Sequence, residues 1–254
     1  LMAVACEGNN AVYRTWNGTS WSATSSISLS TGGTCQWVTL TSDPTSNEIV
    51  AGFHKVTAGN PDFEAQVWNG SAWGNSTSFA DSVSNSFDSV AVTYSSDGSQ
   101  AMLVVNNNTA NSFRYSVWDG SSWSTNLTEP LTRRFYWGNL AADPNSDNLA
   151  LCYVTDTAAG LTYAGVKVWD GAAWGVATNL TTDSNNVSGR AIDCTYETTS
   201  GRTGNLMVTY SDTTNARYQI STSSPDVFEG EQTLDTIEDS WTVTNTRGAD
   251  GTIH

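Results

Sequence analysis

A hexapeptide that begins and ends with tryptophan recurs four times along the chain. Each copy reads Trp-[Asn/Asp]-Gly-x-x-Trp, and the copies occupy 16–21, 68–73, 118–123 and 169–174. Their first tryptophans are 52, 50 and 51 residues apart, and the motif holds eight of the 11 tryptophans. Asn-Gly or Asp-Gly between aromatic or apolar runs predicts a tight β-hairpin, because a type I′ turn needs positive φ at both central residues. Each hexapeptide is therefore predicted to form the tip of a hairpin.

The stretches around each hexapeptide have the alternation and the apolar runs of β-strands. Before the third copy, strands are predicted at 89–94, 101–105 and 113–118, and the residues after the copy supply a fourth. The same order returns around the second and fourth copies. A fifth, divergent repeat places strands at 191–196, 206–210, 217–221 and 227–233, with Ser-Pro-Asp where the tryptophan hairpin would be. No useful 3.6-residue apolar periodicity is present, so helix is not expected.

Repeats of this length with four strands each are typical of a β-propeller. The sequence predicts one domain over 1–254: an all-β, five-bladed propeller with four antiparallel strands per blade. Because the chain starts within a blade, a composite blade is predicted from 241–254, as the innermost strand, and 1–29. In the alternative, the terminal strand reaches into a neighbouring molecule and causes self-association or filament formation.

The charge balance excludes one class of partner. Lys and Arg number 10 against 25 Asp and Glu, which gives a net charge of −15. Binding of nucleic acid requires a basic stripe, and the longest basic run is Arg133-Arg134. No apolar stretch is long enough for a membrane helix, so membrane insertion is not expected. A surface rich in Ser, Thr and Asn, with only 14% charged residues, predicts an extracellular or cell-surface location.

The chain resembles secreted β-propellers, and its hexapeptide is similar to the Asp-box of sialidase-type propellers. In the third copy, Ser116, Asp119, Gly120 and Trp123 stand where that box has Ser, Asp, Gly and Trp, although the spacing from Asp to Trp is one residue shorter. The resemblance covers four of the five repeats. It implies architecture, because such boxes are structural turns in enzymes and non-enzymes alike. Five-bladed lectins resembling tachylectin and five-bladed glycosidases share the predicted ring.

The hairpin tryptophans have two candidate roles. They could stack on the apolar faces of sugars, or they could form cross-strand pairs that wedge each blade against its neighbour. We favour the structural role for all eight: Trp16, Trp21, Trp68, Trp73, Trp118, Trp123, Trp169 and Trp174.

Ligands are expected on the opposite face, where the outermost strand of one blade connects to the innermost strand of the next. Arg133, Arg134 and Arg190 fall in these connections, and Tyr136 ends one of them. Arginines clustered there would hold a carboxylate, sulfate or phosphate, for example on a uronate or sialate. In the alternative they only pair with nearby carboxylates: Asp88, Glu129 and Asp183.

An enzymatic role is the less favoured hypothesis. A glycosidase needs two carboxylates about 5–9.5 Å apart, and no pair stands out among the loop candidates Asp88, Glu129, Asp183, Glu238 and Asp239. Near-equivalent blades suit binding or scaffolding better than one asymmetric catalytic centre. We therefore expect a non-enzymatic structural or adhesive module of a cell-surface protein or appendage, with glycan binding. The alternative is a glycoside hydrolase acting on acidic polysaccharides.

Neither a cofactor nor a metal site is expected, because the four cysteines lack the CxxC spacing of zinc sites. Cys6 follows the second strand of the composite blade, and Cys35 enters the first strand of the next blade. Cys152 and Cys194 repeat that relationship. This placement favours the disulfides Cys6–Cys35 and Cys152–Cys194, which would indicate an oxidising compartment. Four buried free thiols are the alternative.

Overall fold

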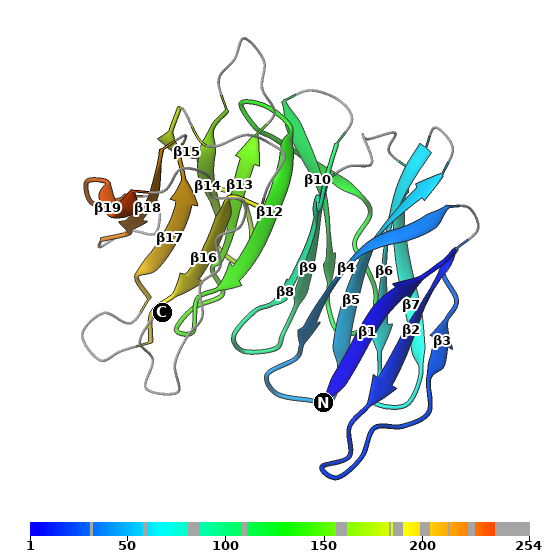
Figure 1. The fold of residues 1–254 in the computed structure, drawn as a ribbon. Helices are drawn as coiled ribbons and strands as arrows, with labels where there is room; N and C mark the ends of the chain where they lie inside the picture. Colours follow the sequence, from blue (N-terminus) through cyan, green and yellow to red (C-terminus); the bar gives the residue numbers. More distant parts are fainter. Residues whose placement is uncertain are drawn as a thin grey trace.

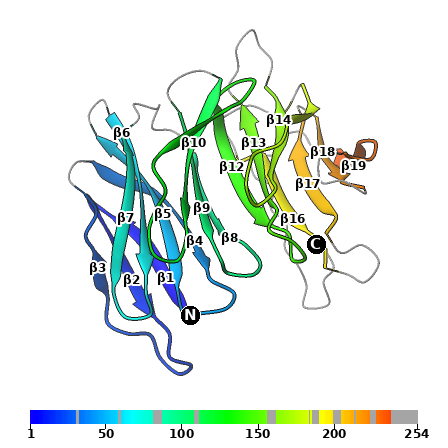
Figure 2. The ribbon, with the colours of Figure 1, turned by 180° about the vertical axis from the view of Figure 1, so that it is seen from behind.

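The structure, a computed structural model, describes residues 1–30, 33–57, 60–80, 87–107, 111–155, 162–182, 184, 190–198, 204–212, 214–222 and 227–236. In this part of the chain the regular elements are β-strands, grouped in five antiparallel sheets. The sheets stand side by side in chain order, as the ribbon shows from front and back (Figures 1 and 2). The strands β4, β8, β12 and β16 contact one another in succession. The fold is the predicted five-bladed β-propeller.

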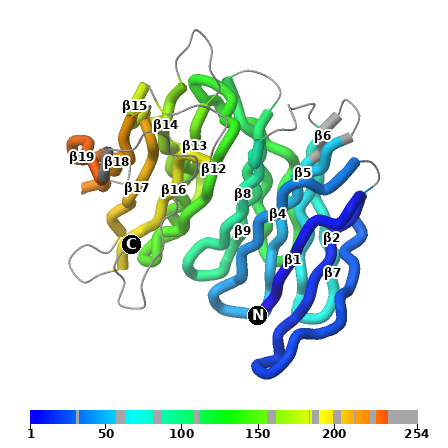
Figure 3. The backbone as a smooth tube through the Cα atoms, in the orientation of Figure 1, coloured from blue at the N-terminus to red at the C-terminus, as the bar shows by residue number. Residues whose placement is uncertain are grey.

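Each blade is a simple antiparallel meander, so the chain completes one blade before it enters the next (Figure 3). The first blade holds β1 (Met2–Glu7), β2 (Asn10–Thr15) and β3 (Ser25–Ile27). The second holds β4 (Thr34–Ser42), β5 (Ile49–Thr57), β6 (Asn60–Trp68) and β7 (Trp73–Ala80). The third holds β8 (Val90–Tyr94), β9 (Ala101–Asn106), β10 (Ser112–Trp118) and β11 (Leu127–Pro130).

The last two blades keep the same order. The fourth holds β12 (Phe135–Ala142), β13 (Leu149–Thr155), β14 (Ala164–Trp169) and β15 (Thr178–Thr181). The fifth holds β16 (Ile192–Tyr196), β17 (Leu206–Ser211), β18 (Asn215–Ile220) and β19 (Gln232–Thr236). The predicted closing strand of the first blade, 241–254, lies outside the described residues. Within the described part, the first sheet has the order β1-β2-β3.

One strand of the fifth blade lies elsewhere than predicted. The sequence suggested a fourth strand over 227–233, whereas β19 spans Gln232–Thr236 and only the isolated pair Ser221–Phe228 precedes it. The same offset occurs in blades that have the tryptophan hairpin: β11 starts at Leu127, four residues after the isolated pair Trp118–Trp123, and β19 starts four residues after Phe228. An isolated pair followed by a break thus precedes the fourth strand with or without the tryptophans.

The prediction of type I′ turns in the tryptophan hairpins is wrong. The glycine of each copy has positive φ, with Gly18 at 102° and Gly120 at 86°, but the preceding Asn or Asp does not. That residue instead accepts hydrogen bonds through its side chain, as Asn17 Oδ1 does from the backbone N–H of Thr19 and of Ser20, each at 2.9 Å. These hydrogen bonds to the Asn or Asp side chain close the turn. Only the glycine therefore needs the left-handed conformation.

The paired tryptophans of one blade pack against the blade before it. Within the third copy, Trp118 and Trp123 lie 5.6 Å apart between ring centroids. Trp118 Nε1 donates to Glu48 Oε1 at 2.6 Å, and Trp123 Nε1 donates to the carbonyl of Asn75 at 2.6 Å. Both acceptors belong to the second blade. In the fourth copy, Trp169 and Trp174 contact Tyr115 of the third blade at 5.8 and 5.9 Å. These contacts give Trp118, Trp123, Trp169 and Trp174 a structural role.

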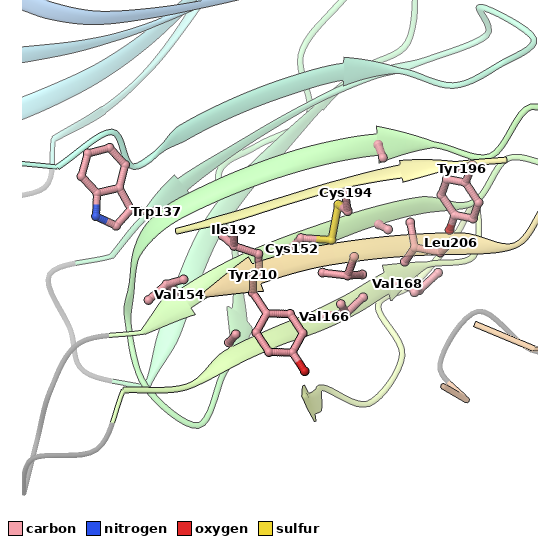
Figure 4. Packing of buried hydrophobic residues seen from close by; sticks show 14 of the residues in the cluster. Trp137, Cys152, Val154, Val166, Val168, Ile192, Cys194, Tyr196, Leu206 and Tyr210 are labelled. Carbon is pink, nitrogen blue, oxygen red and sulfur yellow. A yellow bond between two sulfur atoms is a disulfide. The ribbon is translucent and has the colours of Figure 1, made fainter. Parts of the chain in front are cut away.

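Both predicted disulfides are present. Cys6 bonds to Cys35 and Cys152 bonds to Cys194, with Cα–Cα distances of 5.2 and 6.3 Å. Each joins the second strand of one blade to the first strand of the next, or β1 to β4 and β13 to β16. The second bridge lies within the apolar cluster between the fourth and fifth blades, beside residues such as Ile192 (Figure 4). Covalent bonds thus reinforce two of the contacts between blades.

A buried ion pair fixes the connection between the first two blades. Lys55 and Glu64 have side chains 0% and 2% exposed, and their Nζ and Oε2 atoms are 3.0 Å apart. Ser30, in the connection, donates to Glu64 Oε2 through its backbone N–H at 2.8 Å and its Oγ at 2.6 Å. Lys55 Nζ donates to the Ser30 carbonyl at 3.1 Å. Neither charge is left unpaired, which burial in a low-dielectric interior demands.

Further side-chain contacts hold the exits of the first, third and fourth blades. Gln66 on β6 donates to the Ser28 carbonyl at 2.7 Å, Lys167 on β14 to the Pro130 carbonyl at 2.8 Å, and Gln219 on β18 to the Leu180 carbonyl at 3.1 Å. In each case a side chain on the third strand of one blade donates a hydrogen bond to a backbone carbonyl at the end of the preceding blade. The starting points of the loop-face connections are therefore fixed by side-chain contacts.

Removing the carboxylate of the buried pair should destabilise the fold strongly. The variant Glu64→Ala leaves Lys55 buried without its counter-charge, and we expect a loss of about 3–5 kcal/mol in the free energy of unfolding. Urea denaturation followed by tryptophan fluorescence measures it. The double variant Lys55→Met/Glu64→Leu, which removes both charges, should lose much less. Equal losses in the single and double variants would contradict this account.

Candidate ligand-binding site

The loop face is defined by the blade topology. In a four-stranded meander, the hairpins after the first and third strands lie at one end, and the second hairpin and the exit lie at the other. The tryptophan hairpins occupy the first end. The connections that lead into β8, β12 and β16 reach the opposite end, where the sequence placed the ligand site.

An aromatic cluster occupies this face at the start of the innermost strands. The ring of Phe87, just before β8, stacks on Tyr136 at 4.2 Å with an interplanar angle of 13°. Trp137 of β12 meets Phe87 edge-on at 6.0 Å and Trp37 of β4 at 5.8 Å. The four rings connect the second, third and fourth blades. Such contacts hold the three connections in a fixed relative position.

Two arginines converge on this cluster from different blades. The Arg134 guanidinium lies 5.2 Å from the centroid of Tyr136 and donates to its hydroxyl at 2.8 Å. Arg190 approaches Asp88, the neighbour of Phe87, with 3.8 Å between Nη1 and Oδ2. Because the Arg190 side chain is 38% exposed and its ion pair is long, its guanidinium can also reach a ligand from solvent.

The carboxyl group of Asp88 is the most perturbed acid of the cluster. Burial raises its pKa from the ordinary 3.8 to about 6, although the charge of Arg190 and the N–H of Val90 act in the opposite direction. The folded-state pKa lies above that of the unfolded chain. Asp88 therefore favours folding most below about pH 4, and this contribution is lost as the pH rises through 6.

His54 of β5 supports the cluster from behind. It is fully buried, and its Nδ1–H donates to the carbonyl of Phe87 at 3.2 Å. Burial lowers the pKa of His54 to about 4, while the hydrogen bond to Phe87 opposes the shift. The ring is neutral near pH 7. It orders the Phe87-Asp88 segment and adds no charge there.

The structure brings together only part of the predicted set. Arg134, Tyr136 and Arg190 gather around the Phe87-Asp88 segment, and Arg133 is half-buried beside Arg134. The sequence leaves ion pairing with carboxylates as the alternative to ligand binding. Arg190 forms such a pair with Asp88.

The remaining candidate carboxylates lie elsewhere or beyond the described residues. Glu129 was a suggested partner of the arginines, but it bonds Lys167 at 2.5 Å. Three further candidates, Asp183, Glu238 and Asp239, fall outside the part of the chain that the structure describes.

Four residues of the site carried no functional signal in the sequence. Trp37 and Trp137 had the pattern of strand residues, and Phe87 and His54 belonged to no motif. The position of Phe87 directly before a predicted innermost strand was the one available indication. Contacts between rings from three different blades cannot be read from the order of residues along the chain.

The described residues contain no group of three or more His, Cys, Asp or Glu side chains arranged to hold a metal ion. None of their elements is a helix that could cross a membrane.

Comparison with solved structures identifies similar folds at very low sequence identity. A protein of unknown function from Dyadobacter fermentans has a TM-score of 0.54 at 11% identity, over 86% of this chain and 73% of that one. The NanB sialidase from Streptococcus pneumoniae, in complex with 2-[(3-chlorobenzyl)ammonio]ethanesulfonate, has a TM-score of 0.60 at 8% identity over 99% of this chain. This chain spans 62% of that sialidase. No protein-family model and no curated protein matches the sequence. The likeness supports the propeller fold alone.

The coupling between Asp88 and Arg190 can be measured directly. Replacing Arg190 with Gln removes the positive charge that favours the carboxylate, so the pKa of Asp88 should rise above 6. Carboxyl-carbon NMR shifts recorded against pH report this value. In Arg134→Gln, whose guanidinium lies over Tyr136 instead, the pKa of Asp88 should stay as in the wild type. An unchanged pKa in Arg190→Gln would show that the two groups do not interact.

Proposed function

We propose that this chain is an extracellular structural or adhesive propeller module that binds acidic glycans on its loop face. The observation that carries the proposal is the approach of Arg134 and Arg190, from two blades, to the aromatic cluster around Phe87. Guanidinium groups bind carboxylates and sulfates through paired hydrogen bonds, and aromatic rings offer stacking surfaces to sugars.

Other features support an extracellular location and a ligand site on the loop face. The two disulfides are typical of proteins that fold in an oxidising compartment. The tryptophan hairpins are used in contacts between blades, which leaves the loop face as the less repetitive surface. We propose a cell-surface protein or appendage as the location. Self-association through the terminal segments is the alternative to their closing the first blade.

One observation favours the alternative, a glycoside hydrolase acting on acidic polysaccharides. The pKa of Asp88, about 6, suits a general acid that must be protonated near neutral pH. A partner carboxylate is also required, and Glu129 is neutralised by Lys167. Binding is therefore the better-supported function.

Binding should weaken when either arginine is removed. For a sialylated or uronate-containing oligosaccharide in isothermal titration calorimetry, Arg134→Gln and Arg190→Gln should each raise Kd about tenfold or more, because a hydrogen bond to a charged group is lost. Arg14→Gln, at an exposed arginine of β2, is the control and should bind as the wild type does. A wild-type chain that binds neutral and acidic glycans equally well would contradict the assignment.

Acidic glycans should bind more tightly at pH 5 than at pH 7.5. Below a pKa of about 6, Asp88 is protonated and no longer competes for Arg190. Asp88→Asn should remove this pH dependence and preserve binding. In the hydrolase alternative, the wild type would release sugar from acidic polysaccharides, and Asp88→Asn would abolish the release. That outcome would replace the binding proposal.

A further inference from the structure

A groove of about 860 Å³ lies between the first and second blades, at the end that carries the tryptophan hairpins. One wall comes from β1, from β2, including Tyr13, and from the first tryptophan hairpin, including Trp16. The other comes from the end of β4, the turn into β5 and the second hairpin, including Asn47, Glu48 and Trp68. Its volume falls within the range of roughly 300–1,000 Å³ that is typical of sites for small ligands.

The groove lies beside a ring contact that the repeat keeps: Trp68 lies 5.4 Å from Tyr13 of the first blade, as Trp169 lies 5.8 Å from Tyr115 of the third. The exposure of the tryptophan differs between these copies. Trp68 corresponds to Trp118 and Trp169 in the next two copies of the hexapeptide. Trp118 is 1% exposed and Trp169 is 5% exposed, whereas Trp68 is half-buried and lines the groove. Trp68 therefore packs on Tyr13 as its counterparts pack on the preceding blade, but part of its ring faces the groove.

The strand next to these tryptophans differs in the same way. Ile49, the first residue of β5, is half-buried and lines the groove. The residues that open the second strands of the following blades, Ala101 and Leu149, are 0% exposed. Among the described residues, the first two blades therefore leave open a space that the later blades fill with side chains.

The lining combines aromatic rings with small polar groups. Three rings, those of Tyr13, Trp16 and Trp68, are half-buried, and the polar groups around them are mostly hydroxyls. The hydroxyl-bearing residues are Thr15, Ser22, Ser25, Thr41, Ser42, Ser46 and Ser71. Rings for the apolar face of a pyranose, flanked by hydrogen-bonding groups, are the features that recognise carbohydrate.

The charge of the lining selects between classes of sugar. Glu48 supplies the one ionised side chain among the lining residues. Its Oε1 accepts hydrogen bonds from Tyr94 and Trp118 of the third blade, each at 2.6 Å. A carboxylate in a groove without a lysine or arginine side chain repels an acidic sugar and can accept hydrogen bonds from neutral hydroxyls.

We infer that this groove binds a neutral oligosaccharide of two or three sugar units. The site lies at the opposite end of the blades from the arginine cluster and takes a different ligand class, so it extends the proposed function and does not depend on it. A propeller with both sites would contact two glycans at once. The other candidate occupant is the chain's own segment 237–254, which lies outside the described residues.

Titration of the full chain with maltotriose and triacetylchitotriose, by saturation-transfer NMR and calorimetry, tests the assignment. At least one of these neutral probes should bind. Asn47→Arg places a long side chain in the groove and should weaken binding about tenfold or more. Trp68→Phe reduces the stacking surface and should weaken it less. The acidic probe 3′-sialyllactose should not compete for this site.

Asp147→Arg is the matched control. Asp147 has the same turn position in the fourth blade, and its Cβ lies beside Gly171 as that of Asn47 lies beside Gly70. This variant should bind the neutral probe as the wild type does. Arg134→Gln and Arg190→Gln should also bind it normally, which separates this proposal from the loop-face site.

Three results would overturn the inference. The first is a wild type that binds neither neutral trisaccharide. The second is equal weakening in Asn47→Arg and Asp147→Arg. The third is an Asn47→Arg variant that binds the neutral probe as the wild type does but has a Tm several degrees lower, while the Tm of Asp147→Arg is unchanged. This result would show that the chain itself fills the groove.

Discussion

The packing of paired indole rings against the preceding blade is the interaction on which the rest of the molecule depends. Each pair is held at the base of a four-residue turn. The pairs of the second, third and fourth blades contact the preceding blade through rings or through indole N–H groups, as Trp118 does with Glu48. A four-stranded meander cannot bury both faces alone. The tryptophan pair supplies the large apolar area that makes blade-to-blade contact favourable.

The buried polar contacts then fix the ends of the blades. Lys55, Glu64 and Ser30 hold the first connection, and Gln66, Lys167 and Gln219 act on the exits of three blades. Two disulfides reinforce the same boundaries. As a result, loop-face residues project from rigid strand ends. That rigidity is what permits Arg134 and Arg190, which are 56 positions apart, to lie near one aromatic cluster.

Function is proposed where the repeat is broken. At the loop face the connections differ in sequence, and they place Asp88 beside Arg190 and Phe87 on Tyr136, with no equivalent among the described residues of the other blades. At the hairpin end the first two blades leave a groove that later blades fill. Regular positions in this chain are used for packing. Ligand binding is proposed at the irregular positions.

The sequence by itself determined the propeller, its repeat, the position of nearly every strand and the two disulfides. Those features follow from local patterns: strand alternation, a recurring hairpin and cysteines at matching places in successive repeats. It did not determine the turn type, because Asn17 closes its turn through a side-chain hydrogen bond. Only the tertiary structure decided which groups meet at the loop face and where a groove remains. Those contacts join different blades, and their distances depend on how each sheet packs on the next.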